Sequence, residues 1–101
     1  MSRKDYQDVT MEEFRRLREL PGSIVIDVRE KWEYEEFNEG GINIPLAEIR
    51  ERRALLEPFD NVLVICTNGT RSRVAAMDYC RVAEWREKNI YHLKGGILEV
   101  E

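Results

Sequence analysis

The chain has 101 residues, a formal net charge of −4 and a hydrophobic content of 43%. This length predicts one domain, residues 1–101, with one modest core. The negative charge disfavours nucleic acid and anionic membranes as partners, and no apolar run reaches the ~20 residues that a membrane-spanning helix needs.

The cysteines, the histidine and the N-terminus bear on two further questions, whether the chain binds a metal and in which compartment it resides. Two cysteines without a Cys-x-x-Cys pair, together with one histidine, offer no ligand spacing typical of a metal site. The opening Met-Ser-Arg-Lys-Asp-Tyr lacks the apolar core of a secretory signal. We therefore expect a cytoplasmic protein with reduced thiols and no metal, present as a monomer or a weak dimer.

The first part of the chain predicts a short strand and then a helix. The strand is residues 7–10 at most, and Thr10-Met11-Glu12-Glu13 fits a capping box that starts the helix. One helix face would carry Met11, Phe14 and Leu17. The arginines at 15, 16 and 18 read as a solvated face, and Pro21-Gly22 ends the helix.

The next part alternates strands and helices. Residues 23–28 and 42–44 read as strands, and residues 30–37 read as a short helix with large apolar side chains. Pro45 suits the first turn of a further helix, which Pro58 ends. The inner side of that helix would carry Leu46, Ile49 and Leu56.

Residues 62–72, Val-Leu-Val-Ile-Cys-Thr-Asn-Gly-Thr-Arg-Ser, are the centre of the chain. The apolar, mostly β-branched run 62–65 predicts a strand buried on both faces. Turn-forming residues follow Cys66, and Gly69 permits a positive φ. Ser72 is expected to cap the helix that follows.

This strand–loop–helix arrangement favours an anionic sulfur at Cys66. The loop would lie at the carboxyl end of its strand, where open α/β sheets hold ligands. Inward-pointing N–H groups, the helix N-terminus and Arg71 all favour the thiolate over the thiol, so Cys66 would be a nucleophile without a partner base. The alternative is an inert, buried structural cysteine, which would leave the glycine and arginine of the loop without a role.

The remaining residues complete an alternating pattern. We expect a helix from Ser72 to Trp85, with Cys80 in its core-facing row, and a last strand from Asn89 to Leu93. His92 reads as a packed side chain of that strand. Strands alternating with helices predict an α/β, three-layer fold with a largely parallel sheet.

Four segments resemble the rhodanese-type sulfurtransferase family, in the expected order. Residues 66–72 are similar to its Cys-x-x-Gly-x-Arg-Ser loop, and the other three segments are 26–30, 42–46 and 93–97. The resemblance implies a rhodanese-like fold of about five strands and transfer of sulfane sulfur through a Cys66 persulfide, without a cofactor. It implies a small sulfur donor such as thiosulfate or a persulfide, and a thiol, cyanide or sulfur-relay protein as acceptor.

The resemblance also implies roles for the neighbours of Cys66. The loop residues would bind substrate and stabilise the persulfide: Thr67, Asn68, Gly69, Thr70, Arg71 and Ser72. Asp27 and Arg29 would mainly fix loops around the site, the alternative being that Arg29 binds an anionic substrate. The chain departs from the family at residues 36–41, where the usual Gly-His-Ile-Pro-Gly-Ala turn lacks its histidine, and after Ile97, where it stops before the usual tryptophan and longer helix.

Two other functions stay open. Phosphatases and arsenate reductases of this fold have a loop one residue longer than the six residues from Cys66 to Arg71. A non-catalytic docking module is the other alternative, although such modules often lack the cysteine.

Residues 30–39 carry a cluster of acidic side chains near the expected site: Glu30, Glu33, Glu35, Glu36 and Glu39. Like charges slow encounter with anions, which leads to the hypothesis that this cluster disfavours small dianionic donors such as thiosulfate. A plain solvated helix face is the alternative.

Overall fold

A computed structural model describes residues 5–97. The five strands are β1 Gln7–Val9, β2 Ser23–Asp27, β3 Ile42–Asn43, β4 Asn61–Ile65 and β5 Asn89–Leu93. The α-helices are α1 Met11–Leu17, α2 Lys31–Glu36 and α3 Thr70–Tyr79, and 3-10 turns span Leu46–Glu48, Arg53–Leu56 and Ala83–Trp85. The expectations for residues 1–4 and for the chain after Ile97 lie outside the described residues.

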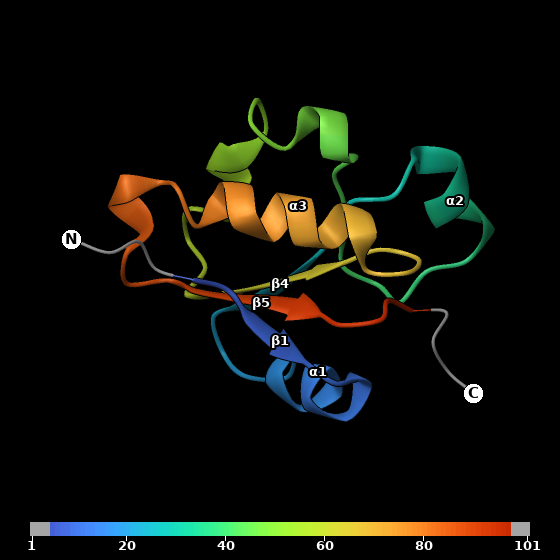
Figure 1. Ribbon diagram of the computed structural model, residues 1–101, viewed down its shortest axis with the longest axis horizontal. Helices are drawn as coiled ribbons and strands as arrows, with labels where there is room; N and C mark the ends of the chain where they lie inside the picture. Colours follow the sequence, from blue (N-terminus) through green and yellow to red (C-terminus); the bar gives the residue numbers. More distant parts are fainter. Residues whose placement is uncertain (1–4, 98–101) are drawn as a thin grey trace.

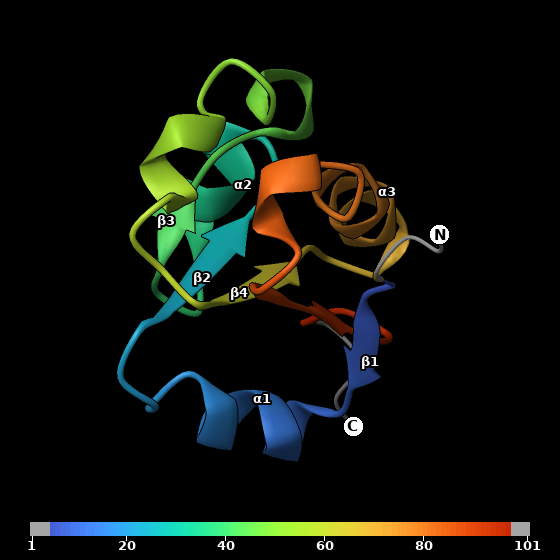
Figure 2. The same ribbon diagram turned by 90° about the vertical axis from the view of Figure 1, so that its left-hand side faces the viewer.

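The strands form one sheet in the order β1-β5-β4-β2-β3, and each recorded strand pair is parallel. Helix α1 covers one face of the sheet, and α2 and α3 lie on the other (Figures 1 and 2). The expected α/β, three-layer rhodanese-like fold is confirmed. Because all pairs are parallel, the carboxyl ends of β2, β4 and β5 share one edge of the sheet.

Alternate residues of the central strands serve two separate cores. In β4, Val62 and Val64 pack in a cluster with Ala75, Ala76 and Tyr79 of α3. Leu63 and Ile65 belong to a second cluster, which includes Phe14 of α1. Successive side chains of a strand point to opposite faces, and here both faces are covered, which explains the unbroken apolar sequence.

The helix after Cys66 differs from the expected one at both ends. It begins at Thr70 with Gly69 as N-cap, at φ +91°, so Ser72 lies inside the first turn and is not the cap. The left-handed conformation of glycine lets the chain pass directly from the loop into the helix. The helix ends at Tyr79, because Val82 is extended and the chain turns back toward β5 through residues 83–85.

Other boundaries follow the sequence more closely. The capping box at Thr10 is present, with Glu13 N donating to Thr10 Oγ1 at 3.1 Å and Thr10 N donating to Glu13 Oε1 at 2.9 Å. Strand β5 has the expected limits. The single helix expected after Pro45 is wrong: two short 3-10 turns occupy this stretch, where the chain folds over α3.

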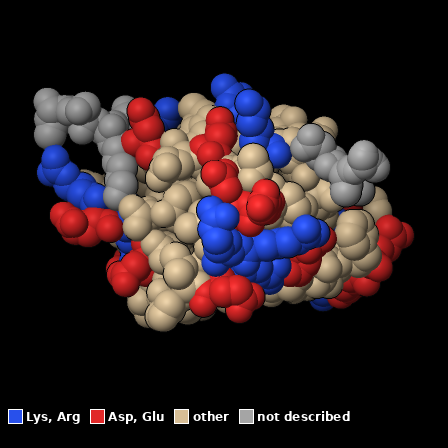
Figure 3. All heavy atoms as spheres, turned by 90° about the horizontal axis from the view of Figure 1, so that it is seen from below, with Lys and Arg blue, Asp and Glu red and all other residues tan. Residues whose placement is uncertain are grey.

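The face that carries α1 has a mixed charge. Arg15 and Arg16 are exposed, whereas Arg18 lies over the Phe14 ring, 5.0 Å from its centroid. Basic and acidic side chains lie next to one another on this side (Figure 3). Within residues 5–97, no helix has the length and apolarity to cross a membrane.

Candidate active site around Cys66

The loop that carries Cys66 is held from below by the turn after β5. Ile97 N donates to the Cys66 carbonyl at 2.9 Å. Gly96 has φ +79°, and a Cβ there would overlap the main-chain carbonyl of Thr67. Glycine after β5 thus lets two backbone segments come into contact, and this contact helps to position the Cys66 loop at the sheet edge.

Three hydrogen-bonding groups, two main-chain N–H groups and one hydroxyl, converge on the Cys66 sulfur. Gly69 N and Ser72 N lie 3.1 and 3.2 Å from Sγ, and Ser72 Oγ lies 3.3 Å from it. Main-chain N–H groups at a helix start carry partial positive charge. The hydroxyl of Ser72 accepts from a thiol or donates to a thiolate. This geometry suits a sulfur that carries negative charge.

Cys66 itself has no exposed surface. The sequence predicts a sulfur ready for attack at the sheet edge, whereas the sulfur is covered in this state. A reactant therefore reaches Sγ only when neighbouring side chains or the loop move. Cys66 and Cys80 are not joined in a disulfide, and Cys80 is partly buried against the core, as expected.

Two other loop residues maintain the shape of the loop. Thr70 N donates to Asn68 Oδ1 at 3.1 Å, so that N–H group is turned toward Asn68 and away from the sulfur. Both side chains are exposed. Thr67 contributes its carbonyl to the contact with Gly96. Of the six expected loop residues, the structure brings Gly69 and Ser72 to Sγ.

The Arg71 guanidinium binds a carboxylate of α2. Its Nη1 and Nη2 lie 2.7 and 3.0 Å from the two oxygens of Glu33. This bidentate contact lowers the pKa of Glu33 to about 2. The pKa of Arg71 is raised, mainly by Glu33 and to a smaller extent by the Cys66 sulfur. Helix α2 thus stands beside the loop and the start of α3 (Figure 1).

Asp27 and Arg29 form a buried ion pair at the end of β2. Arg29 Nη2 lies 2.9 Å from Asp27 Oδ2, and the two side chains are 3% and 0% exposed. The same nitrogen donates to the Phe37 carbonyl at 2.8 Å, and Asn43 Nδ2 donates to the carbonyls of both residues of the pair. These contacts favour a role in fixing loops over direct binding of a substrate.

The model of the rhodanese-like domain matches residues 10–101. The chain belongs to this family. It is 35% identical over 71 residues to a Bacillus subtilis protein described as "Putative sulfur carrier protein YrkF", a match that covers 68% of this chain and 38% of that protein.

Solved structures agree with the family. A rhodanese-related protein from Thermoplasma volcanium has a TM-score of 0.74 at 30% identity, over 91% of this chain and 87% of its own. Reduced CoADR-RHD from Bacillus anthracis has a TM-score of 0.72 at 30% identity, over 92% of this chain and 16% of its own. In that protein and in YrkF, the part that matches this rhodanese-like domain is less than half of a longer chain.

The turn at which this rhodanese-like domain lacks the family histidine is built from other contacts. The Tyr34 hydroxyl donates to the Gly41 carbonyl at 2.8 Å. Asn38 donates to the Tyr34 carbonyl and accepts from Gly40 N, both at 2.9 Å. A Cβ at Gly41 would lie within 2.7 Å of the Val25 side chain, so glycine is required where this turn meets β2.

His92 is the residue that sequence reasoning missed. It was expected only to pack within β5, and it is indeed buried, but its Nε2 lies 3.0 Å from the Gly69 carbonyl and its Nδ1 lies 2.8 Å from Asp8 Oδ1. A carbonyl oxygen only accepts, so Nε2–H is the donor in the contact with Gly69. The register that sets His92 between Val64 of β4 and Asp8 of β1 is not visible in the sequence.

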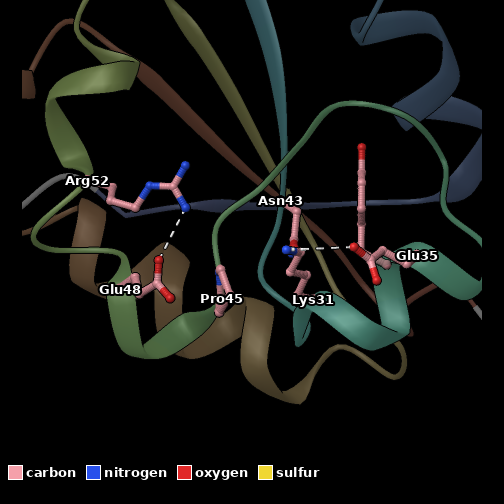
Figure 4. Close-up of a pocket in the computed structure, with 7 residues that line it drawn as sticks. Lys31, Glu35, Asn43, Pro45, Glu48 and Arg52 are labelled. Atoms are coloured by element: carbon pink, nitrogen blue, oxygen red, sulfur yellow. Dashed lines mark hydrogen bonds and ion pairs between the residues drawn. The ribbon is translucent and has the colours of Figure 1, made fainter.

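A depression lies beside α2, away from the Cys66 loop. It has a volume of about 400 Å³ and is lined by Lys31, Tyr34, Glu35, Asn43, Pro45, Glu48 and Arg52. Figure 4 shows two ion pairs on its opposite sides, Glu48 with Arg52 and Lys31 with Glu35. No residue of the 66–72 loop lines it. Within residues 5–97, no group of three or more His, Cys, Asp or Glu side chains is arranged to hold a metal ion.

Proposed function

We propose that this rhodanese-like domain transfers sulfane sulfur through a persulfide on Cys66. The Cys66 thiolate attacks the outer sulfur of a donor, a new S–S bond forms, and the donor's own S–S bond breaks. The remainder of the donor leaves with the bonding electron pair. A thiol, cyanide or partner protein then removes the sulfur, so the reaction is a covalent exchange in two steps.

The observation that carries this proposal is the convergence of Gly69 N, Ser72 N and Ser72 Oγ on Sγ. Donors aimed at a sulfur stabilise negative charge there. A persulfide extends the anion by one atom, and the same two N–H groups together with the start of α3 favour negative charge there. The relative described as a sulfur carrier supports the same chemistry.

Access to the sulfur is part of the proposal. Because Cys66 has no exposed surface, the loop or its neighbours must move before a donor reaches the sulfur. The small loop suits one added sulfur atom better than a tetrahedral oxyanion, which disfavours a phosphatase or an arsenate reductase. A docking module that does no chemistry would have no use for three hydrogen-bonding groups around one cysteine.

Intact-mass spectrometry tests the proposal directly. The protein is incubated with thiosulfate and, separately, with a cysteine desulfurase and cysteine. We expect a gain of one sulfur (~32 Da) from at least one donor, absent in Cys66→Ser and retained in the matched control Cys80→Ser. The donor that loads the domain separates a free-standing thiosulfate enzyme from a carrier in a sulfur relay.

Two results would overturn the proposal. If neither donor adds sulfur to the wild-type protein, the docking module becomes the better interpretation. If Cys66→Ser still gains the mass, the sulfur resides elsewhere and the role given to the loop is wrong.

A further inference from the structure

The Arg71 guanidinium of the Cys66 loop is already bound by the Glu33 carboxylate. Both terminal nitrogens of Arg71 contact Glu33, at 2.7 and 3.0 Å, and the two side chains are 32% and 17% exposed. Paired charge-assisted hydrogen bonds of this kind are among the strongest that side chains make. Glu33 is held in turn, because its Oε1 accepts from Glu30 N at 2.8 Å in the cap of α2.

This pairing matters for an oxyanion donor. Thiosulfate carries two negative charges and releases sulfite, so the attack of Cys66 on its outer sulfur would benefit from a cation beside the loop. Arg71 belongs to the same loop and directly precedes Ser72, whose N–H and hydroxyl contact Sγ. With Glu33 in place, however, the pair has no net charge, and the carboxylate occupies the edge of the guanidinium formed by Nη1 and Nη2.

Arg29, a second arginine near the site, is also paired with a carboxylate. Arg29 is 3% exposed and paired with Asp27, which is fully buried. Removing one member of a buried pair leaves an uncompensated charge and is costly. Arg29 is therefore a poor substitute for Arg71 as a binding group for sulfite.

A persulfide donor has different needs. Its outer sulfur is transferred and its inner sulfur leaves as a thiolate, so no oxyanion group has to be bound. The N–H groups that reach Sγ are sufficient to receive the incoming sulfur. The Glu33–Arg71 pair can remain intact throughout this reaction.

We propose that Glu33 is a specificity-determining residue that withholds Arg71 from oxyanions and so favours persulfide donors over thiosulfate. This inference rests on the proposed sulfur transfer through Cys66. In the favoured reaction, the Cys66 thiolate attacks the outer sulfur of R–S–SH, giving a protonated Cys66 persulfide and the thiolate R–S⁻. One S–S bond forms, one breaks, and the proton stays on the transferred sulfur.

The test compares two donors in one variant series. Single-turnover loading of Cys66 is followed by intact mass with sodium thiosulfate and with cysteine persulfide, and the ratio of the two rates is the readout. Glu33→Gln keeps the shape of the side chain and removes its charge. We expect it to raise the thiosulfate-to-persulfide ratio about tenfold, as expected for release of one charge-assisted contact.

Glu36→Gln is the matched control. Glu36 is exposed on the same helix, so this variant removes an equal charge without touching Arg71. We expect its ratio to stay within about twofold of the wild-type ratio, because exposed charges act weakly through water. An equal rise in both variants would contradict the proposal and support the general effect of the acidic cluster.

A double variant tests the route through Arg71. If Glu33 acts by occupying the guanidinium, adding Arg71→Gln to Glu33→Gln removes the gain. A gain that persists without Arg71 would overturn the proposal. So would an unchanged ratio in Glu33→Gln, or a wild-type protein that prefers thiosulfate.

The failure of the proposed function gives a separate result. If wild-type protein takes sulfur from neither donor, both inferences are wrong. If it takes sulfur from cysteine persulfide but Glu33→Gln leaves the ratio unchanged, only the role of Glu33 is wrong. Thermal unfolding of each variant verifies that the rates refer to folded protein.

Discussion

His92 Nε2 lies 3.0 Å from the carbonyl oxygen of Gly69, a residue whose N–H group lies 3.1 Å from the Cys66 sulfur. A side chain of β5 thus holds the backbone of a loop that follows β4. The Gly69 carbonyl also accepts from Arg73 N at 3.2 Å, in the first turn of α3. The loop is therefore fixed from the sheet and from the helix at one atom.

The first prediction concerns this contact. His92→Leu removes both hydrogen bonds of the ring, and we expect loading of Cys66 with sulfur to slow about tenfold, with a loss of about 1–3 kcal/mol in the free energy of unfolding. His92→Gln keeps a donor for the Gly69 carbonyl and should restore most of the rate. Asp8→Asn is the control for the outer contact, whose partner is half exposed. Equal rates in His92→Leu and wild type would show that the contact does not position the loop.

The second prediction concerns the close approach of Gly96 to the loop. Gly96→Ala would place a Cβ against the Thr67 carbonyl. We therefore expect the free energy of unfolding, measured with urea, to fall by about 2–4 kcal/mol. We also expect Cys66 to be loaded with sulfur more slowly. Gly22→Ala is the matched control, because it has a similar φ of +80° but its nearest neighbour is an Asp60 side-chain oxygen at 3.2 Å. That variant should cost only about 1–2 kcal/mol, from backbone strain. Similar losses in both would mean that contact with the loop adds nothing.

The third prediction is a pH dependence of stability. The pKa of Glu33 is lowered from 4.5 to about 2 by Arg71, so the pair stabilises the fold above pH 4.5 and this contribution is lost as the pH falls through about 2. At neutral pH, the free energy of unfolding of the wild type should exceed that of Glu33→Gln by about 1–2 kcal/mol, a figure that allows for screening by solvent. The difference should shrink steadily below pH 4.5 in acid-titrated urea unfolding. A difference that does not change over this range would indicate that the charge of Glu33 is not its source.

The fourth prediction concerns the buried pair at the end of β2. Asp27→Asn leaves the Arg29 charge buried without its partner, so we expect the free energy of unfolding to fall by about 3–5 kcal/mol. Arg50→Gln breaks an ion pair with Asp78 in which Arg50 is 74% exposed. This control should lower the free energy of unfolding much less than Asp27→Asn does, because water can replace much of the lost contact at Arg50. Chemical unfolding measures both, and a small loss in Asp27→Asn would argue against a structural role for the pair.

Much of the fold could be predicted because it depends on local chemistry. The β-branched runs of β2 and β4, the capping box at Thr10 and the limits of β5 each follow from residues within one short segment. The turn glycines and Cys66 likewise occur together in one stretch of chain. The wrong boundaries, at both ends of α3 and after Pro45, are places where a turn geometry or a tertiary contact overrides the local pattern.

The amino-acid sequence by itself determined the family, the parallel α/β architecture and the cysteine at the end of the central strand, because each is written in neighbouring residues. Only the tertiary structure decided that Glu33 binds Arg71, 38 positions away, that His92 holds Gly69, 23 positions away, and that the Cys66 sulfur is covered. The physical reason is that these contacts depend on strand register and helix placement, which bring distant segments together at one edge of the sheet.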